Sequence, residues 1–143
     1  VGGILKGKHS LMALTMIKSY DEYLFNHSVN VGILTMALGE TMGLDVAALK
    51  ELGLGALLHD VGKINIPETI IRAPRKLTDE EWEIIKRHPV DGVKILEQMG
   101  VQSEIALRVT KEHHIDFDGR GYPRLGPDEQ AHPYSMIVHV ADT

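Results

Sequence analysis

Apolar side chains recur at steps of three and four residues along most of this chain, which is the spacing of one face of an α-helix. A first series consists of Leu24, Val31, Leu34 and Leu38, so His27 shares a face with predicted core residues. A second consists of Val46, Leu49, Leu52 and Ala56, which the pattern predicts to form a buried stripe. No segment alternates apolar and polar residues as a half-buried strand does. The pattern therefore predicts an all-α fold.

Capping signals divide this pattern into separate helices. Asp45 is a predicted N-cap, and Thr78 with Glu81 has the spacing of a capping box. Gly100 follows a helical segment, as a C-terminal glycine commonly does. The stretch DFDGRGYPRLGPDEQ, residues 116–130, is rich in glycine and proline and predicts a loop before a last helix.

Length and composition indicate one globular domain over residues 1–143. Apolar residues make up 43% of the 143 residues and charged residues 24%, and no apolar run reaches the ~18 residues that span a bilayer. The absence of cysteine excludes disulfides and thiolate metal sites, and it suits a reducing cytoplasm. A net charge of −5 argues against a broad nucleic-acid-binding surface.

Residues 1–20 are either a linker or an additional helix. Leu11, Leu14 and Ile17 fall on one helical face. That face suits a signalling linker or a dimer contact, and it equally suits a helix that covers the core of its own domain.

Titratable side chains gather on apolar helix faces and at predicted helix ends. They are His27, His59, Asp60, His88, His113, His114 and Asp142. Each alone has an ordinary explanation, such as a hydrogen-bonded core histidine or an exposed acid. Together they are harder to explain without a ligand, because each would need its own satisfied niche. Facing helices in bundles commonly supply such side chains to metals, so we expect one or two divalent ions.

Two longer motifs carry a family resemblance. HDVGKINIP, residues 59–67, resembles the His-Asp signature of the HD phosphohydrolase superfamily, and HHIDFDGRGYP, residues 113–123, resembles the second signature of its HD-GYP branch. HSVNV at His27, HP at His88 and VAD at Asp142 follow in the order of the same branch. The resemblance implies a single compact HD-domain helical bundle with a metal site between the helices.

In that family these positions form a metal centre that cleaves cyclic di-GMP, a bacterial second messenger. Carried over, one metal would be held by His27, His59, Asp60 and Asp142, and a second by His88, His113 and His114, with Asp60 bridging both. Asp60 and Lys63 would be the catalytic residues, since Lys63 resembles the lysine that contacts the scissile phosphate. The implied reaction is hydrolysis to pGpG, and onward to GMP, by a metal-bridging hydroxide that attacks phosphorus. The resemblance suggests iron or manganese, with zinc and nickel as alternatives.

The loop signature adds a second candidate region. Gly119 and Gly121 allow backbone angles closed to other residues, and Pro123 restricts the exit from the turn. After paired histidines, such a turn is expected to face the substrate or a partner. Tyr122 would either stack on guanine or pack the loop against the helices.

Three departures from the family pattern modify these expectations. Tyr23 occupies the position where some members carry a third-metal glutamate, which favours two metals over three. Ile115 replaces a glutamate after the paired histidines, which weakens outer support of the ligands. Family domains also continue into further helices beyond the position of Asp142, so we expect a C-terminally truncated domain.

Other functions stay open at this point. One alternative is another HD nucleotide phosphohydrolase, and a second is a non-catalytic module that binds cyclic di-GMP or a partner protein. The family also predicts an N-terminal receiver or sensor domain, or a GGDEF-type partner protein.

Overall fold

The structure is a computed structural model that describes the backbone of residues 2–142 and the side chains of residues 11–142. The predicted domain, 1–143, extends one residue beyond the described chain at each end. The elements are α1 (Gly2–Tyr20), α2 (Glu22–Thr41), α3 (Val46–Leu58), the 3-10 helix η1 (Val61–Asn65), α4 (Glu68–Ile71), α5 (Asp79–Ile85), α6 (His88–Gln98), α7 (Glu104–Glu112) and α8 (Pro133–Asp142). The all-α prediction is confirmed, because the only β-pairing within residues 2–142 is an isolated bridge between Ile115 and Gly121.

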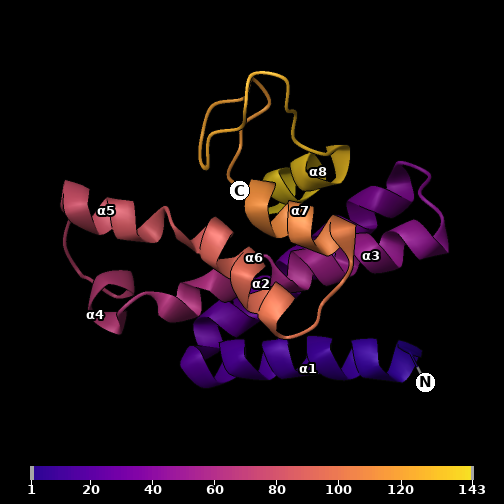
Figure 1. Ribbon diagram of the computed structural model, residues 1–143, viewed down its shortest axis with the longest axis horizontal. Coiled ribbons are helices and arrows are strands. Elements are labelled where there is room, and N and C mark those ends of the chain that lie inside the picture. The colour runs from indigo at the N-terminus through magenta and orange to yellow at the C-terminus, as the bar shows by residue number, and fades with distance from the viewer. Residues whose placement is uncertain (1, 143) are drawn as a thin grey trace.

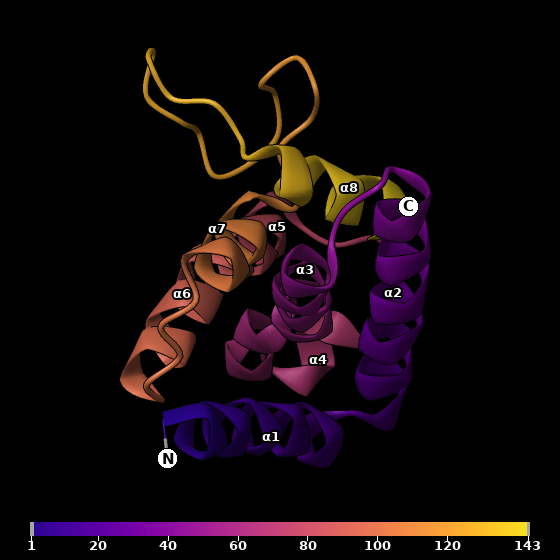
Figure 2. The same ribbon diagram turned by 90° about the vertical axis from the view of Figure 1, so that its right-hand side faces the viewer.

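The helices surround α3, which lies near the middle of the bundle (Figure 2). In that view α2 lies on one side of α3, α6 and α7 lie on the other, α1 runs beneath and α8 above. The segment between α7 and α8 protrudes as a long loop in both ribbon views (Figure 1). None of the described helices is long and apolar enough to cross a membrane.

The predicted caps are present. The Asp45 carboxylate accepts a hydrogen bond from the Ala48 backbone N–H at 2.8 Å. Thr78 and Glu81 form the reciprocal capping box at the start of α5. Asp21 caps α2 by accepting from the backbone of Tyr23 and Leu24. These contacts satisfy N–H groups that a helix start leaves without an internal partner, so they define where the helices begin.

The first helix packs on its own domain. Ile17 and Ala13 are fully buried in one core cluster, together with Leu58 and Leu96, while Leu11 is 65% exposed. Residues 2–20 are therefore helical, and the face that includes Ile17 covers the core.

Parts of the two predicted apolar faces lie at the surface. Leu34 is 52% exposed and Val46 is 68% exposed, so the prediction is wrong for these two positions. Val46 is the first residue of α3. Leu38, 37% exposed, borders an apolar groove of about 790 Å³ beside Met42. Helical spacing identifies a face, but tertiary packing decides how far along it the burial extends.

Glycines allow two close contacts between segments that carry or adjoin the predicted metal ligands. A Cβ on Gly32 in α2 would lie 3.1 Å from the Leu57 side chain of α3, so these helices approach closely there. A Cβ on Gly62 in η1 would overlap the carbonyl oxygen of His88. Only glycine permits this approach of η1 to α6.

Candidate metal centre

The predicted ligands come together from five separate parts of the chain. His27 lies in the second turn of α2, His59 and Asp60 follow α3, and His88 opens α6. His113 and His114 follow α7, and Asp142 is the last residue of α8. His59, Asp60, His88 and His113 are buried, whereas 34% of the His27 side chain is exposed.

The candidate ligands form two groups that share one carboxylate. The first group is His27, His59, Asp60 and Asp142, and the second is Asp60, His88, His113 and His114. Within each group, one potential ligand atom per residue lies within 4.8 Å of all the others. Asp60 therefore lies where it can bridge two ions.

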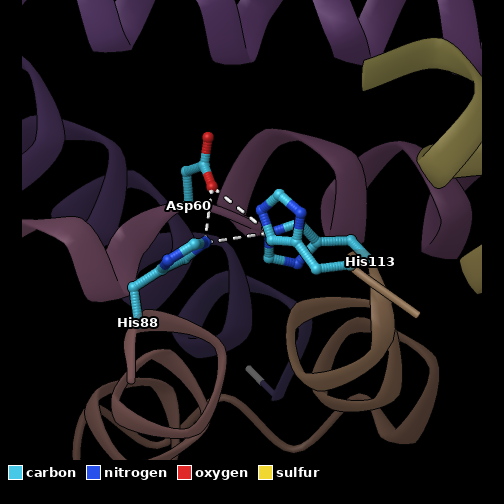
Figure 3. Close-up of side chains that lie close together, drawn as sticks. Asp60, His88 and His113 are labelled. Carbon is cyan, nitrogen blue, oxygen red and sulfur yellow. Dashed lines mark hydrogen bonds and ion pairs between the residues drawn. The ribbon is translucent and has the colours of Figure 1, made fainter. Parts of the chain in front are cut away.

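Asp60 directs one oxygen toward each group. Its Oδ1 lies 3.3 Å from His88 Nε2 and 3.3 Å from His113 Nε2 (Figure 3). Its Oδ2 lies 3.2 Å from His59 Nε2. On the far side of the first group, Asp142 Oδ1 lies 2.7 Å from His27 Nε2 and 3.4 Å from His59 Nε2.

Three histidines are oriented by the backbone of the helix that precedes them. The Nδ1 atoms of His59, His88 and His113 face the carbonyl oxygens of Ala56, Ile85 and Thr110, respectively. Each acceptor lies three residues earlier, in the last turn of α3, α5 or α7. When a neutral imidazole donates its Nδ1–H to the carbonyl, Nε2 keeps its lone pair for the interior of the cluster.

Helix ends also favour positive charge at this place. His59 and His113 are the C-caps of α3 and α7, so both helices end against the cluster. The final carbonyls of a helix carry partial negative charge, which attracts cations over about one turn.

Burial and charge act in opposite directions on the titratable groups. Burial lowers the pKa of His113 to about 4 and that of His114 to about 3, so both imidazoles are neutral at pH 7 and able to bind a metal. Burial also disfavours charge on His59, but Asp60 and Asp142 outweigh it and raise the pKa of His59 to about 10. Burial opposes ionisation of Asp60 too, yet His59 and Lys63 hold its pKa well below the usual range.

These residues fit a divalent cation. Within the described residues, His59 Nε2 and both carboxylate oxygens of Asp60 are buried without a hydrogen-bond partner. His88 Nε2 and His113 Nε2 are 3.2 Å apart, so two lone pairs face each other when both Nδ1 atoms carry the proton. Polar atoms buried without a hydrogen bond cost about 1–3 kcal/mol each, and one divalent ion in each of the two groups would ligate all of these atoms. The His and Asp clusters could therefore hold a metal.

Lys63 and Tyr122 lie at the edge of the cluster. Lys63 Nζ is 3.3 Å from Asp60 Oδ2, and 24% of its side chain is exposed. The Tyr122 ring stacks on His114 with centroids 4.7 Å apart. Burial, with the charges of Asp60 and Asp142, raises the pKa of Tyr122 to about 12, so its hydroxyl stays protonated and can donate.

The loop returns to the cluster through Gly121. Its φ is +104°, and a Cβ there would overlap the His114 carbonyl oxygen, so the backbone passes directly beside the paired histidines. Gly119 also has a positive φ of +86° but lies in open space. The Tyr122–Pro123 peptide bond is cis.

The departures predicted from the sequence occupy distinct places. Tyr23 lies one helical turn before His27 and is 81% exposed. Ile115 is only 1% exposed, so it packs inside the domain rather than facing the ligands as a polar group.

Sequence reasoning missed a residue that joins α8 to the cluster. His139 Nδ1 faces the His113 carbonyl oxygen at 2.8 Å, and its Nε2 lies 3.3 Å from Asp116 Oδ1. The available signal was its position three residues before Asp142 on the last helix, close to one turn away.

Comparisons with known proteins identify the family of this chain. The family model of the HD domain matches residues 24–143. A cyclic di-GMP phosphodiesterase of Pseudomonas aeruginosa is 38% identical over 139 residues, covering 97% of this chain and 34% of the relative. A cyclic di-GMP phosphodiesterase of Thermotoga maritima is 40% identical, covering 93% and 37%. A 3′3′-cGAMP-specific phosphodiesterase of Vibrio cholerae is 32% identical, covering 93% and 31%. The chain thus spans about a third of the length of these relatives.

Solved structures show the same fold. An HDG"Y"P protein of Bdellovibrio bacteriovorus superimposes with a TM-score of 0.69 at 25% identity, over 82% of this chain and 39% of that one. The phosphodiesterase HD domain of L. monocytogenes, in complex with cyclic di-AMP, gives a TM-score of 0.66 at 18% identity, over 91% and 70%.

Proposed function

This chain belongs to the HD domain family, in the branch that carries the Gly-Tyr-Pro signature, and from that membership we propose that it hydrolyses cyclic di-GMP to pGpG, and onward to GMP, in a metal-dependent reaction. The observation that carries the proposal is the sharing of Asp60 between two groups of potential ligands. One carboxylate that serves two ion positions is the arrangement expected of a centre with paired metals.

His27, His59, Asp60 and Asp142 would hold one divalent ion, and Asp60, His88, His113 and His114 the other. When bound, such ions supply Lewis acidity toward water and toward phosphate oxygens. We propose iron or manganese on the basis of the resemblance to the HD-GYP branch, since a donor set of imidazoles and carboxylates without thiolates suits these ions and suits zinc and nickel as well. Two ions are favoured over three because Tyr23 offers no carboxylate beside His27.

The other polar residues would act on the substrate. Lys63 is close enough to Asp60 to be positioned by it, and its ammonium would bind an oxygen of the scissile phosphate. The protonated Tyr122 hydroxyl would donate to a phosphate or ribose oxygen, while Gly119, Gly121 and Pro123 shape the loop that presents it. These groups would stabilise negative charge as the bond to phosphorus breaks.

The test is turnover of a substrate panel by the protein loaded with Mn²⁺ or anaerobically with Fe²⁺. Cyclic di-GMP, 3′3′-cGAMP and cyclic di-AMP are followed by chromatography, and metal content is measured in the same samples. Loss of turnover in Asp60→Asn, with retained helical circular dichroism, would support the proposal. Failure of a folded, metal-loaded protein to cleave cyclic di-GMP would refute it.

A further inference from the structure

A cavity of about 560 Å³ opens beside the metal centre, between the start of α2 and the end of α4. His27 and Lys63 line it on the side of the metal centre, and Tyr23 and Arg72 line it further out. We propose that this cavity, called here the Tyr23–Arg72 pocket, binds one guanine base of the cyclic dinucleotide. This inference rests on the proposed function, which requires the scissile phosphate to lie at the adjoining metal centre.

The pocket has a suitable size and position. Small-molecule sites usually enclose about 300–1,000 Å³. Because Lys63 lines the pocket and also contacts Asp60 at 3.3 Å, the pocket and the metal centre share a wall. A nucleotide whose phosphate lies beside Lys63 can therefore extend its base into the pocket without crossing the protein.

Tyr23 offers an aromatic face. It lies four residues before His27, hence on the same side of α2, and its side chain is 81% exposed. An aromatic ring this exposed contributes little to the core, whereas stacking of a base on an aromatic side chain contributes about 1–3 kcal/mol.

Arg72 is held in a fixed orientation. Its Nε and Nη2 lie 3.3 Å and 3.2 Å from Asp21 Oδ2, and Asp21 is itself anchored as the N-cap of α2. The side chain of Arg72 is still 57% exposed. A planar guanidinium held on one edge can present its remaining N–H groups to a ligand with little further loss of entropy.

Charge around Arg72 favours a neutral base over a second phosphate. Asp21 compensates the guanidinium at 3.2 Å, and Glu68 lies 3.9 Å from its Nη1. A phosphate group in this place would be repelled by the two carboxylates as well as attracted by the guanidinium. A neutral purine base is instead recognised through hydrogen bonds. The guanidinium of Arg72 can still donate these, although Asp21 compensates its charge.

Guanine matches this donor array better than adenine. Guanine presents two acceptors, O6 and N7, on one edge, and arginine binds both at once. Adenine places an amino donor where guanine has O6, so its donor would oppose those of Arg72. The Tyr23–Arg72 pocket therefore supplies both a stacking surface and a means of distinguishing the two purines.

The test compares kcat and KM of the Mn²⁺-loaded protein on cyclic di-GMP, 3′3′-cGAMP and cyclic di-AMP. Arg72→Lys keeps the charge but removes the planar fork, so the preference for guanine-containing substrates over cyclic di-AMP should fall by roughly 5- to 150-fold. Tyr23→Ala should raise KM for all three substrates, and Tyr23→Phe should recover that loss because it keeps the ring. Arg75→Lys is the matched control, since Arg75 is 56% exposed and paired with Glu81 but does not line the pocket.

Two outcomes would overturn the inference: an Arg72→Lys protein whose base preference equals that of Arg75→Lys, or a Tyr23→Ala protein with unchanged KM. Calorimetric comparison of GMP and AMP binding tests the pocket separately from the proposed function, because it requires no turnover. The two ligands carry identical phosphates, so a difference in their affinities reports on the base alone. If the wild type cleaves no dinucleotide, the proposed function fails. The pocket then stands if Arg72→Lys abolishes a preference for GMP over AMP, and falls if wild type shows no such preference.

Discussion

The close approach of η1 to α6 predicts that Gly62→Ala will damage both stability and metal binding. The added Cβ would overlap the His88 carbonyl oxygen and lie 2.7 Å from the Gly92 backbone nitrogen, where ordinary contacts begin near 3.4 Å. Both opposing atoms belong to backbone, so no change of side-chain rotamer can relieve the overlap. The two segments must separate, and this separation lengthens the 3.3 Å distance between Asp60 and His88.

The expected cost follows from that geometry. Overpacking in a well-packed interior costs about 1–3 kcal/mol, and a backbone-to-backbone overlap belongs at the upper end of that range. For a domain of this length, roughly 3–4 °C of melting temperature correspond to each kcal/mol, so we expect a fall of about 10 °C. Metal affinity should fall by roughly 10- to 100-fold, as it does when the support of a ligand is disturbed.

The measurements are urea unfolding of the metal-free protein and Mn²⁺ titration by calorimetry. Gly43→Ala is the control, because Gly43 has φ of +86° but no atom lies within 4 Å of a Cβ there. It should cost only the ~1–2 kcal/mol of a left-handed backbone and leave Mn²⁺ affinity unchanged. Equal stability and equal Mn²⁺ affinity of the Gly62→Ala and Gly43→Ala proteins would refute the reasoning.

Three further predictions concern the metal and the capping box. Mn²⁺ at 100 times its dissociation constant should raise the free energy of unfolding by about 2.7 kcal/mol, and Asp60→Asn should abolish this increase in a thermal melt. Thr78→Ala should lower the free energy of unfolding by about 1 kcal/mol in urea, whereas Thr78→Ser should not. Hydrogen bonds from Arg75 and from the Thr78 backbone lower the pKa of Glu81 from 4.5 to about 2. Because the folded pKa is depressed, this stabilisation is complete above pH 4.5 and disappears as the pH falls toward 2. Glu81→Gln should flatten the pH dependence of unfolding over that interval, and an unchanged slope would contradict the assignment.

Local interactions explain why much of the fold could be predicted. Asp45, Thr78 and Glu81 act on backbone groups within three residues, so their effect is visible in the sequence itself. The polar side chains that end α3 and α7 could also be recognised in the sequence, because they directly follow helical segments with an apolar face. The order of the motifs then matched these candidates to the ligand positions of the HD-GYP branch.

Contacts between distant segments could not be predicted in this way. Arg72 and Asp21 are 51 positions apart, and their pairing depends on how α4 lies against the start of α2. Periodicity likewise could not show that Leu34 faces outward, or that His139 reaches the His113 carbonyl. Each of these contacts is decided by the packing of helices that are far apart in the chain.

The backbone contacts of His59, His88 and His113 link the local opening of three helix ends to the loss of ligands from the candidate metal centre. Each Nδ1 faces a carbonyl in the last turn of α3, α5 or α7, a group that has no partner within its own helix. Fraying of any of these ends would withdraw its imidazole from the common centre. Two cations joined through the shared Asp60 would hold the three Nε2 atoms, so they would suppress fraying at three places distant in the chain and couple their hydrogen exchange into a single cooperative unit.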